Sequence, residues 1–160
     1  MDIQSIAPSI DIIDYEAALK PYFVKLNVEW IEKYFKVEQH DVETLEMCET
    51  FILDRGGHIY FARDTEGVIL GTVALEKVGH AAFDVIKMAV APAAQGRQIG
   101  KKLMLHVIEQ ARVLGAKELF LESNTRLVPA VALYRKVGFV EIPLLDSPFE
   151  RANIRMLLTL

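Results

Sequence analysis

The chain has 160 residues, of which 52% are hydrophobic and 25% charged, and its net charge is −4. This length predicts one domain, residues 1–160, with a sizeable core, and the acidic balance argues against a nucleic-acid partner. No apolar run is long enough to span a membrane. The single cysteine, Cys48, excludes an internal disulfide, and the first residues lack the basic segment of a signal peptide. We therefore expect a soluble, cytoplasmic protein.

The first third of the chain predicts mainly helices. Residues 2–7 are compatible with a short strand. Apolar residues recur at spacings of three and four over 14–35, which is typical of a helix. Pro21 either opens the first turn of this helix or kinks it, and Asn27 is a candidate N-cap of a second helix. Another helix is expected over 41–53.

The middle of the chain predicts strands. Residues 58–62 and 68–78 are rich in β-forming residues, and the turn at 64–67 joins them. A third strand is expected over 81–90. Pro92 follows it and is expected to end it, because proline cannot donate to a sheet ladder.

The last third alternates helices and strands. The apolar stripe over 99–114 predicts a helix, a strand follows at 118–123, and a second helix is expected over 129–136. Two last strands are expected at 139–142 and 153–160. Helices first, then an antiparallel meander, then alternating elements indicate a mixed α/β fold around one central sheet.

A glycine turn precedes the helix that begins near residue 99. Gly96 and Gly100 lie beside three cations, Arg97, Lys101 and Lys102. A helix N-terminus disfavours cations, but its unpaired N–H groups bind anions well. A bound pyrophosphate would account for the cations. The alternative is an ordinary strand-to-helix turn with solvated lysines.

The spacing excludes two common nucleotide-binding motifs. The glycines are one residue too close for a Walker-type loop, and no G-x-G-x-x-G pattern is present. The segment MAVAPAAQGRQIGKKLM instead resembles the acetyl-CoA-binding segment of the GNAT superfamily of N-acetyltransferases, whose motif is [QR]-x-x-G-x-[GA]. Gln95 and Gly100 match this motif, and Gln98 replaces its middle glycine.

A second segment supports the same resemblance. PAVALYRKVGF, residues 129–139, is similar to the family signature A-x-x-L-Y-x-K-x-G-F, and the two segments follow the family order. The resemblance extends from about residue 57 to the end of the chain. It implies a mixed, mostly antiparallel central sheet of about six or seven strands flanked by helices. The implied activity is direct transfer of an acetyl group from acetyl-CoA to a primary amine.

The resemblance also implies which residues bind the cosubstrate. The pyrophosphate would lie on the amides of the 95–101 turn, and the pantetheine would run beside the strand that contains Val90. Many family members have an asparagine at the position of Leu127, and Asn124 is the candidate replacement here. The implied cofactor-binding residues are Met88, Ala89, Val90, Gln95, Gly96, Arg97, Gln98, Ile99, Gly100, Lys101 and Asn124.

Two residues are the candidates for proton transfer. The resemblance makes Tyr134 the acid that protonates the leaving thiolate, and a phenol with a pKa near 10 is protonated at neutral pH. Its alternative role is that of a core aromatic. Asp84 is the candidate base, because a carboxylate in an apolar strand is costly without a role. Its alternative is a solvated acid at the end of a strand.

The acceptor side is less well defined. Glu122 is a second acidic candidate, and Arg151 and Asn153 are candidate acceptor-binding residues, although Arg151 also fits a surface turn. His106 is expected to be solvated, and the histidines lack metal-ligand spacing, so we expect no metal.

The acceptor itself is not defined by the sequence. We expect a small-molecule or peptide amine, and the sequence leaves the oligomeric state open, with a homodimer among the options. The alternative function is a non-catalytic acyl-CoA-binding or interaction module with the same fold.

Overall fold

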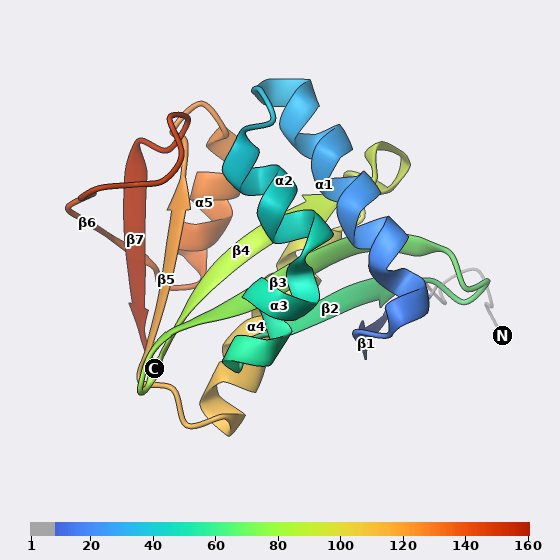
Figure 1. Cartoon of the computed structure of the whole chain (residues 1–160), viewed down its shortest axis with the longest axis horizontal. Helices are drawn as coiled ribbons and strands as arrows, with labels where there is room; N and C mark the ends of the chain where they lie inside the picture. Colours follow the sequence, from blue (N-terminus) through green and yellow to red (C-terminus); the bar gives the residue numbers. More distant parts are fainter. Residues whose placement is uncertain (1–8) are drawn as a thin grey trace, which may run out of the picture.

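The computed structural model describes residues 9–160, so the strand expected at 2–7 lies outside the described residues. Within 9–160, seven strands form one sheet in the order β1-β2-β3-β4-β5-β7-β6 (Figure 1). All neighbouring pairs are antiparallel except β4 and β5. The mixed, mostly antiparallel sheet that the resemblance implied is therefore confirmed. The strands are β1 (Asp11–Asp14), β2 (His58–Arg63), β3 (Ile69–Gly79), β4 (Ala82–Val90), β5 (Glu118–Ser123), β6 (Val140–Ile142) and β7 (Ile154–Thr159).

Helices cover both faces of the sheet (Figure 1). In β2, Ile59 and Phe61 pack in the cluster under α1 to α3, whereas Tyr60 and Ala62 pack in the cluster with α4. Side chains alternate between the faces of a strand, so both faces of this strand are apolar because both are covered. The helices are α1 (Lys20–Tyr34), α2 (Gln39–Glu46), α3 (Cys48–Phe51), α4 (Ile99–Val113) and α5 (Val128–Lys136). None of these described helices has the length and apolar character needed to cross a membrane.

Two expectations for the N-terminal helices are wrong. Asn27 is not an N-cap: it is buried in the middle of α1, and its side-chain amide donates to the Phe23 carbonyl over 2.9 Å. This local bond satisfies a polar side chain inside a helix. The helix expected over 41–53 is divided into α2, α3 and a 3₁₀ turn (Leu53–Arg55), because Met47 leaves helical geometry with ψ 38°. Pro21 does lie in the first turn of α1.

The parallel strands β4 and β5 separate soon after they meet. They pair only between 82–84 and 118–120. Further along, Thr72 faces Ala89 but Ala74 faces Ile86, so β4 contains one residue more than β3. Such a bulge bends a strand and leaves a residue out of the ladder. The two strands therefore diverge towards their C-terminal ends (Figure 1).

Candidate active site

A cavity of about 640 Å³ lies where β4 and β5 diverge. Its walls include residues 88–90 of β4, residues 121–124 at the end of β5, Gly100 and Tyr134. Five of the predicted cofactor-binding residues thus line the same cavity: Met88, Ala89, Val90, Gly100 and Asn124. The other predicted members form the turn beside it, outside the lining.

The turn has the backbone conformation that an anion site requires. Gly96 and Gln98 both adopt left-handed conformations, with φ of 86° and 60°. Gln98 stands where the family motif has glycine, which is the residue that tolerates this conformation best. Lys102 N–H donates to the Gln98 carbonyl over 3.1 Å, so the N–H groups of residues 99–101 lack an intrahelical acceptor.

Side chains at the turn leave room for a ligand. A Cβ added at Gly100 would meet only Val90 Cγ2, at 4.0 Å, so this glycine faces open space. Ile99 is fully buried, which leaves its backbone N–H as the group that can reach a ligand. Gln95 accepts a hydrogen bond from Lys33 over 3.4 Å. The free amides and the open glycine fit a pyrophosphate, and its binding at this turn stays a prediction.

Tyr134 reaches the cavity from α5. Its ring packs edge-on against Phe139, with the ring centroids 6.2 Å apart. Burial raises the pKa of the phenol to about 12, and the Ser123 side chain acts in the opposite direction. The phenol is therefore protonated at neutral pH, as an acid for a leaving thiolate must be.

Asp84 lines the cavity at the point where β4 and β5 separate, because it is the last residue of β4 that pairs with β5. The alternative of a solvated strand-end acid is wrong, since 20% of the side chain is exposed and Oδ1 is buried. Burial raises the pKa of this carboxyl to about 6; Arg155 lowers it, and Glu76 and Glu122 raise it. A carboxyl with this pKa is ionised at neutral pH and suits a general base.

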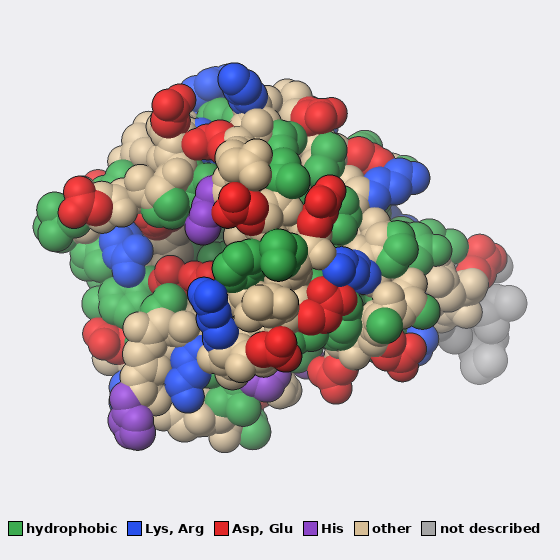
Figure 2. All heavy atoms as spheres, viewed as in Figure 1, with side chains coloured by type: hydrophobic (Ala, Val, Ile, Leu, Met, Phe, Trp, Pro, Cys, Tyr) green, Lys and Arg blue, Asp and Glu red, His purple; other side chains and the backbone are tan. Residues whose placement is uncertain are grey.

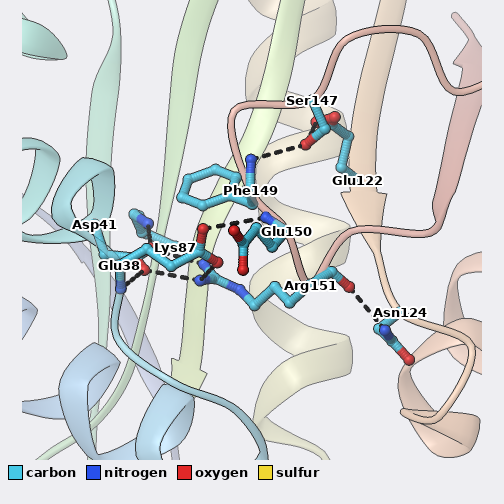
Figure 3. Close-up of polar contacts among 9 residues, drawn as sticks. All are labelled: Glu38, Asp41, Lys87, Glu122, Asn124, Ser147, Phe149, Glu150 and Arg151. Atoms are coloured by element: carbon cyan, nitrogen blue, oxygen red, sulfur yellow. Dashed lines mark hydrogen bonds and ion pairs between the residues drawn. The ribbon is translucent and has the colours of Figure 1, made fainter.

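Charged side chains surround Asp84 on the same face of the sheet. Glu76 of β3 lies directly opposite Asp84 in the sheet, and Glu122 of β5 lies directly opposite Arg155 of β7. Glu122 also accepts a hydrogen bond from the Ser147 hydroxyl over 3.3 Å (Figure 3). Arg155 lies over the Phe120 ring, 4.7 Å from its centroid. This part of the wall thus contains three carboxyl groups and one guanidinium.

Arg151 also lines the cavity, but its charge is already paired (Figure 3). Its two terminal nitrogens each donate to Asp41 over 2.7 Å, and one of them donates to Glu38 over 3.1 Å. The predicted acceptor-binding role of Arg151 therefore remains a prediction, because its observed partners belong to the protein.

Two asparagines hold the chain around the cavity. The Asn124 amide donates to the Arg151 carbonyl over 2.7 Å, and its oxygen accepts from Arg126 N–H over 2.8 Å. Asn153 was expected on the acceptor side but lies outside the cavity lining, because both ends of its amide bind Thr125. Of these two asparagines, only Asn124 lines the cavity.

The expectation for His106 is also wrong. Its ring packs edge-on against Tyr60 at 4.7 Å, and burial lowers its pKa. Within residues 9–160, no group of three or more His, Cys, Asp or Glu side chains is placed to hold a metal ion.

The sequence interpretation missed Asp41 and Lys87. Asp41 is completely buried, and Lys87 donates to it. Asp41 resembled an ordinary acid in the first turn of a helix. Lys87 carried a detectable signal, because a charged residue in an apolar strand is the same feature that identified Asp84.

Comparison with known proteins identifies the family of this chain. The sequence pattern of the acetyltransferase (GNAT) family matches residues 23–139, most of the chain. The chain therefore belongs to the GNAT family of acetyltransferases, whose members use acetyl-CoA to acetylate amines.

Individual acetyltransferases are also similar to this chain. The chain is 34% identical over 94 residues to the uncharacterized N-acetyltransferase YjgM of Escherichia coli K12, a match that spans 57% of this chain and 56% of that protein. It is 27% identical over 127 residues to an IAA acetyltransferase of Azospirillum brasilense, covering 79% and 82% of the two chains. A GNAT-family acetyltransferase structure from Staphylococcus aureus Mu50 superposes with a TM-score of 0.84 at 23% identity, covering 94% and 99%. This last similarity confirms the fold.

Proposed function

We propose that this protein transfers an acetyl group from acetyl-CoA directly to a primary amine. The observation that supports the proposal best is that Asp84 and Tyr134 line the same cavity with matched protonation states. Burial raises the pKa of Asp84 only to about 6, so it is ionised at neutral pH, while the phenol of Tyr134 stays protonated. One group is ready to accept a proton and the other to donate one.

The residues beside the diverging strands would hold the cosubstrate. The amides of residues 99–101 would bind the pyrophosphate, and Arg97, Lys101 and Lys102 would add positive charge. Acetyl-CoA supplies the activated acetyl group as a thioester. The strand segment 88–90 would pair with the pantetheine along the edge that β5 leaves open.

The strand geometry supports Val90 N–H as the donor to the thioester oxygen. Ala91 N–H donates to the Leu70 carbonyl of β3 over 2.8 Å. Successive N–H groups of a strand point to opposite edges, so Val90 N–H points away from β3, towards the cavity. A fixed N–H donor at this point would stabilise negative charge on the carbonyl oxygen in the transition state.

The proton transfers then follow from the two side chains. Asp84 takes a proton from the acceptor ammonium, directly or through water, and the neutral amine attacks the carbonyl carbon. As the carbon–sulfur bond breaks, Tyr134 gives its proton to the departing sulfur, and the attacking nitrogen loses its remaining extra proton to solvent, so coenzyme A and the neutral amide leave. The phenolate regains a proton from protonated Asp84, directly or through water, so both side chains return to their starting states and one proton is released to solvent in each cycle.

The charges near Asp84 favour a cationic acceptor. Glu76, Asp84 and Glu122 line the cavity, and the Arg155 guanidinium lies 3.9 Å from Asp84 Oδ1. On the face seen in Figure 2, acidic and basic side chains alternate without a wide patch of one sign. An ammonium group that enters the cavity would therefore meet these three carboxyl groups there.

The test is coenzyme A release, followed with a thiol reagent across a panel of primary amines, with the products identified by mass spectrometry. Formation of an acetylated amine supports the proposal. Binding of acetyl-CoA without turnover of any amine would favour the non-catalytic module instead.

A further inference from the structure

We propose that Asp41, Lys87 and Arg151 form a positioning network that links the acceptor side of the cavity to the strand expected to bind acetyl-CoA. Arg151 would thereby set the affinity for acetyl-CoA without touching it. The inference rests on the proposed function for its ligand, but the network itself is visible in the contacts of the three side chains (Figure 3).

Asp41 is the centre of the network. Its side chain is 0% exposed and accepts hydrogen bonds from Arg151, Lys87 and the Glu38 N–H (Figure 3). Burial would raise its pKa, but the hydrogen bonds from Arg151 and Lys87 lower it to about 2. The carboxylate is therefore charged at neutral pH, and it is the shared hydrogen-bond acceptor of Lys87 and Arg151.

Lys87 connects this carboxylate to the bulge in β4. It adopts φ 54°, a left-handed conformation that is unfavourable for a residue with a side chain. Such conformations persist where the surroundings fix them. The side chain is 5% exposed and is held by Asp41 from α2. The contact anchors the bulge immediately before the 88–90 segment.

Arg151 connects the same carboxylate to the 143–153 loop, which lies between β6 and β7. The loop has further attachments: Glu150 N–H donates to Glu38 over 3.1 Å. The Phe149 ring lies 4.7 Å from Lys87 Nζ and 4.4 Å from the Arg151 guanidinium carbon. Three segments, α2, β4 and the loop, therefore meet at one buried charge.

This arrangement makes the two cations interdependent. Removing Arg151 takes two hydrogen bonds from Asp41 and lets the carboxylate move relative to Lys87. A shift of Lys87 changes the bulge, and with it the direction of the Met88 and Val90 amides. Because Asp41 and Glu38 already satisfy the charge of Arg151, an effect on acetyl-CoA binding would be indirect.

The first test measures the affinity for acetyl-CoA by calorimetry, without an acceptor. Arg151→Gln is expected to weaken binding about tenfold, the size of a coupling carried through packed groups. Arg151→Lys keeps the charge but loses the two-pronged contact, so an intermediate loss is expected. Arg63→Gln is the matched control, because Arg63 is outside the cavity lining and pairs only loosely with Asp11. Unchanged affinity in a folded Arg151→Gln variant would overturn the proposal.

A double-mutant cycle separates this indirect effect from direct contact. Lys87→Met removes one cation from Asp41 and keeps both hydrogen bonds from Arg151 to this carboxylate. If the network acts as a unit, adding Arg151→Gln to Lys87→Met weakens acetyl-CoA binding less than it does in the wild type. Fully multiplicative losses would mean that the two residues act independently, contrary to the proposal.

Hydrogen exchange tests the network even if acetyl-CoA does not bind. In the ligand-free protein, the amides of 86–90 are expected to exchange faster in Arg151→Gln than in the wild type and in Arg63→Gln. Equal rates would refute the network. If the wild type binds no acetyl-CoA but Arg151→Gln exchanges faster than the wild type, the proposed function is refuted and the network stands.

Discussion

Asp84 Oδ1 lies 3.9 Å from the Arg155 guanidinium, which is too far for a hydrogen bond, and the oxygen has no other donor among residues 9–160. Arg155 therefore offsets part of the free-energy cost of burying the charged carboxylate, but it makes no hydrogen bond to Oδ1. The result is a carboxyl group with a pKa of about 6 that still has a lone pair for an incoming proton.

This relationship predicts the pH dependence of catalysis. In the wild type, kcat/KM is expected to rise through an inflection near pH 6, where Asp84 ionises. Asp84→Asn should lower kcat/KM by about 10²-fold at neutral pH, the usual effect of removing a general base, and should abolish the inflection. Steady-state rates from pH 5 to 9 with a single acceptor measure both effects.

Glu122→Gln is the matched control. It removes another carboxylate from the same wall, and the charge of Glu122 raises the pKa of Asp84. The control should therefore move the inflection to lower pH and keep it. If Asp84→Asn retained the inflection and Glu122→Gln lost it, Glu122 would be the base.

Asp84 also predicts a change in stability. Because its pKa is higher in the folded state than its ordinary value of 3.8, ionisation above pH 4 weakens the fold as pH rises towards 6. Asp84→Asn should therefore raise the free energy of unfolding at pH 8, by at most about 3 kcal/mol, and have little effect at pH 4. Urea unfolding at the two pH values measures this difference. Destabilisation at pH 8 would show that the carboxylate stabilises the fold.

Tyr134→Phe distinguishes the two possible roles of Tyr134, as a catalytic acid or as a core aromatic side chain. The variant keeps the ring contact with Phe139, so the free energy of unfolding and the affinity for acetyl-CoA should change little. Turnover should fall by about 10²–10⁴, as expected when a positioned acid is lost. If kcat were unchanged while acetyl transfer limits the rate, Tyr134 would have only a packing role and would not be the acid.

Local patterns in the sequence predicted much of the fold. Runs of β-forming residues bounded by turns predicted β2 to β5, and the stripe from Ile99 predicted α4, because both patterns are properties of short segments. The boundaries failed where a single backbone angle decides them, as at Met47, or where a side chain satisfies itself within a helix, as Asn27 does.

The site was predictable only in part. The glycine turn and Tyr134 belong to compact motifs, and Asp84 was conspicuous as a charge in an apolar strand. The Asp41 network was not predicted, because it joins residues 46 and 110 positions apart in the chain. Such contacts depend on the tertiary fold, and a helix N-terminal acid gives no local sign of them.

Gly100→Val tests the central claim most directly, because it changes the expected pyrophosphate site with little cost to the fold. The added Cβ would meet no protein atom closer than 4.0 Å, so the variant should fold. By contrast, a Cβ at Gly71 would meet Ile99 Cγ2 at 2.9 Å, and that glycine is unsuitable for the test. Circular dichroism confirms the fold of the variant before binding is measured.

The decisive measurement is the calorimetric titration of acetyl-CoA into the wild type and into Gly100→Val. If the 95–101 turn holds the pyrophosphate, the wild type binds and the variant loses at least about tenfold in affinity, since the side chain obstructs the approach to the backbone amides. Equal affinities in two folded proteins, or no binding by the wild type, would contradict this account.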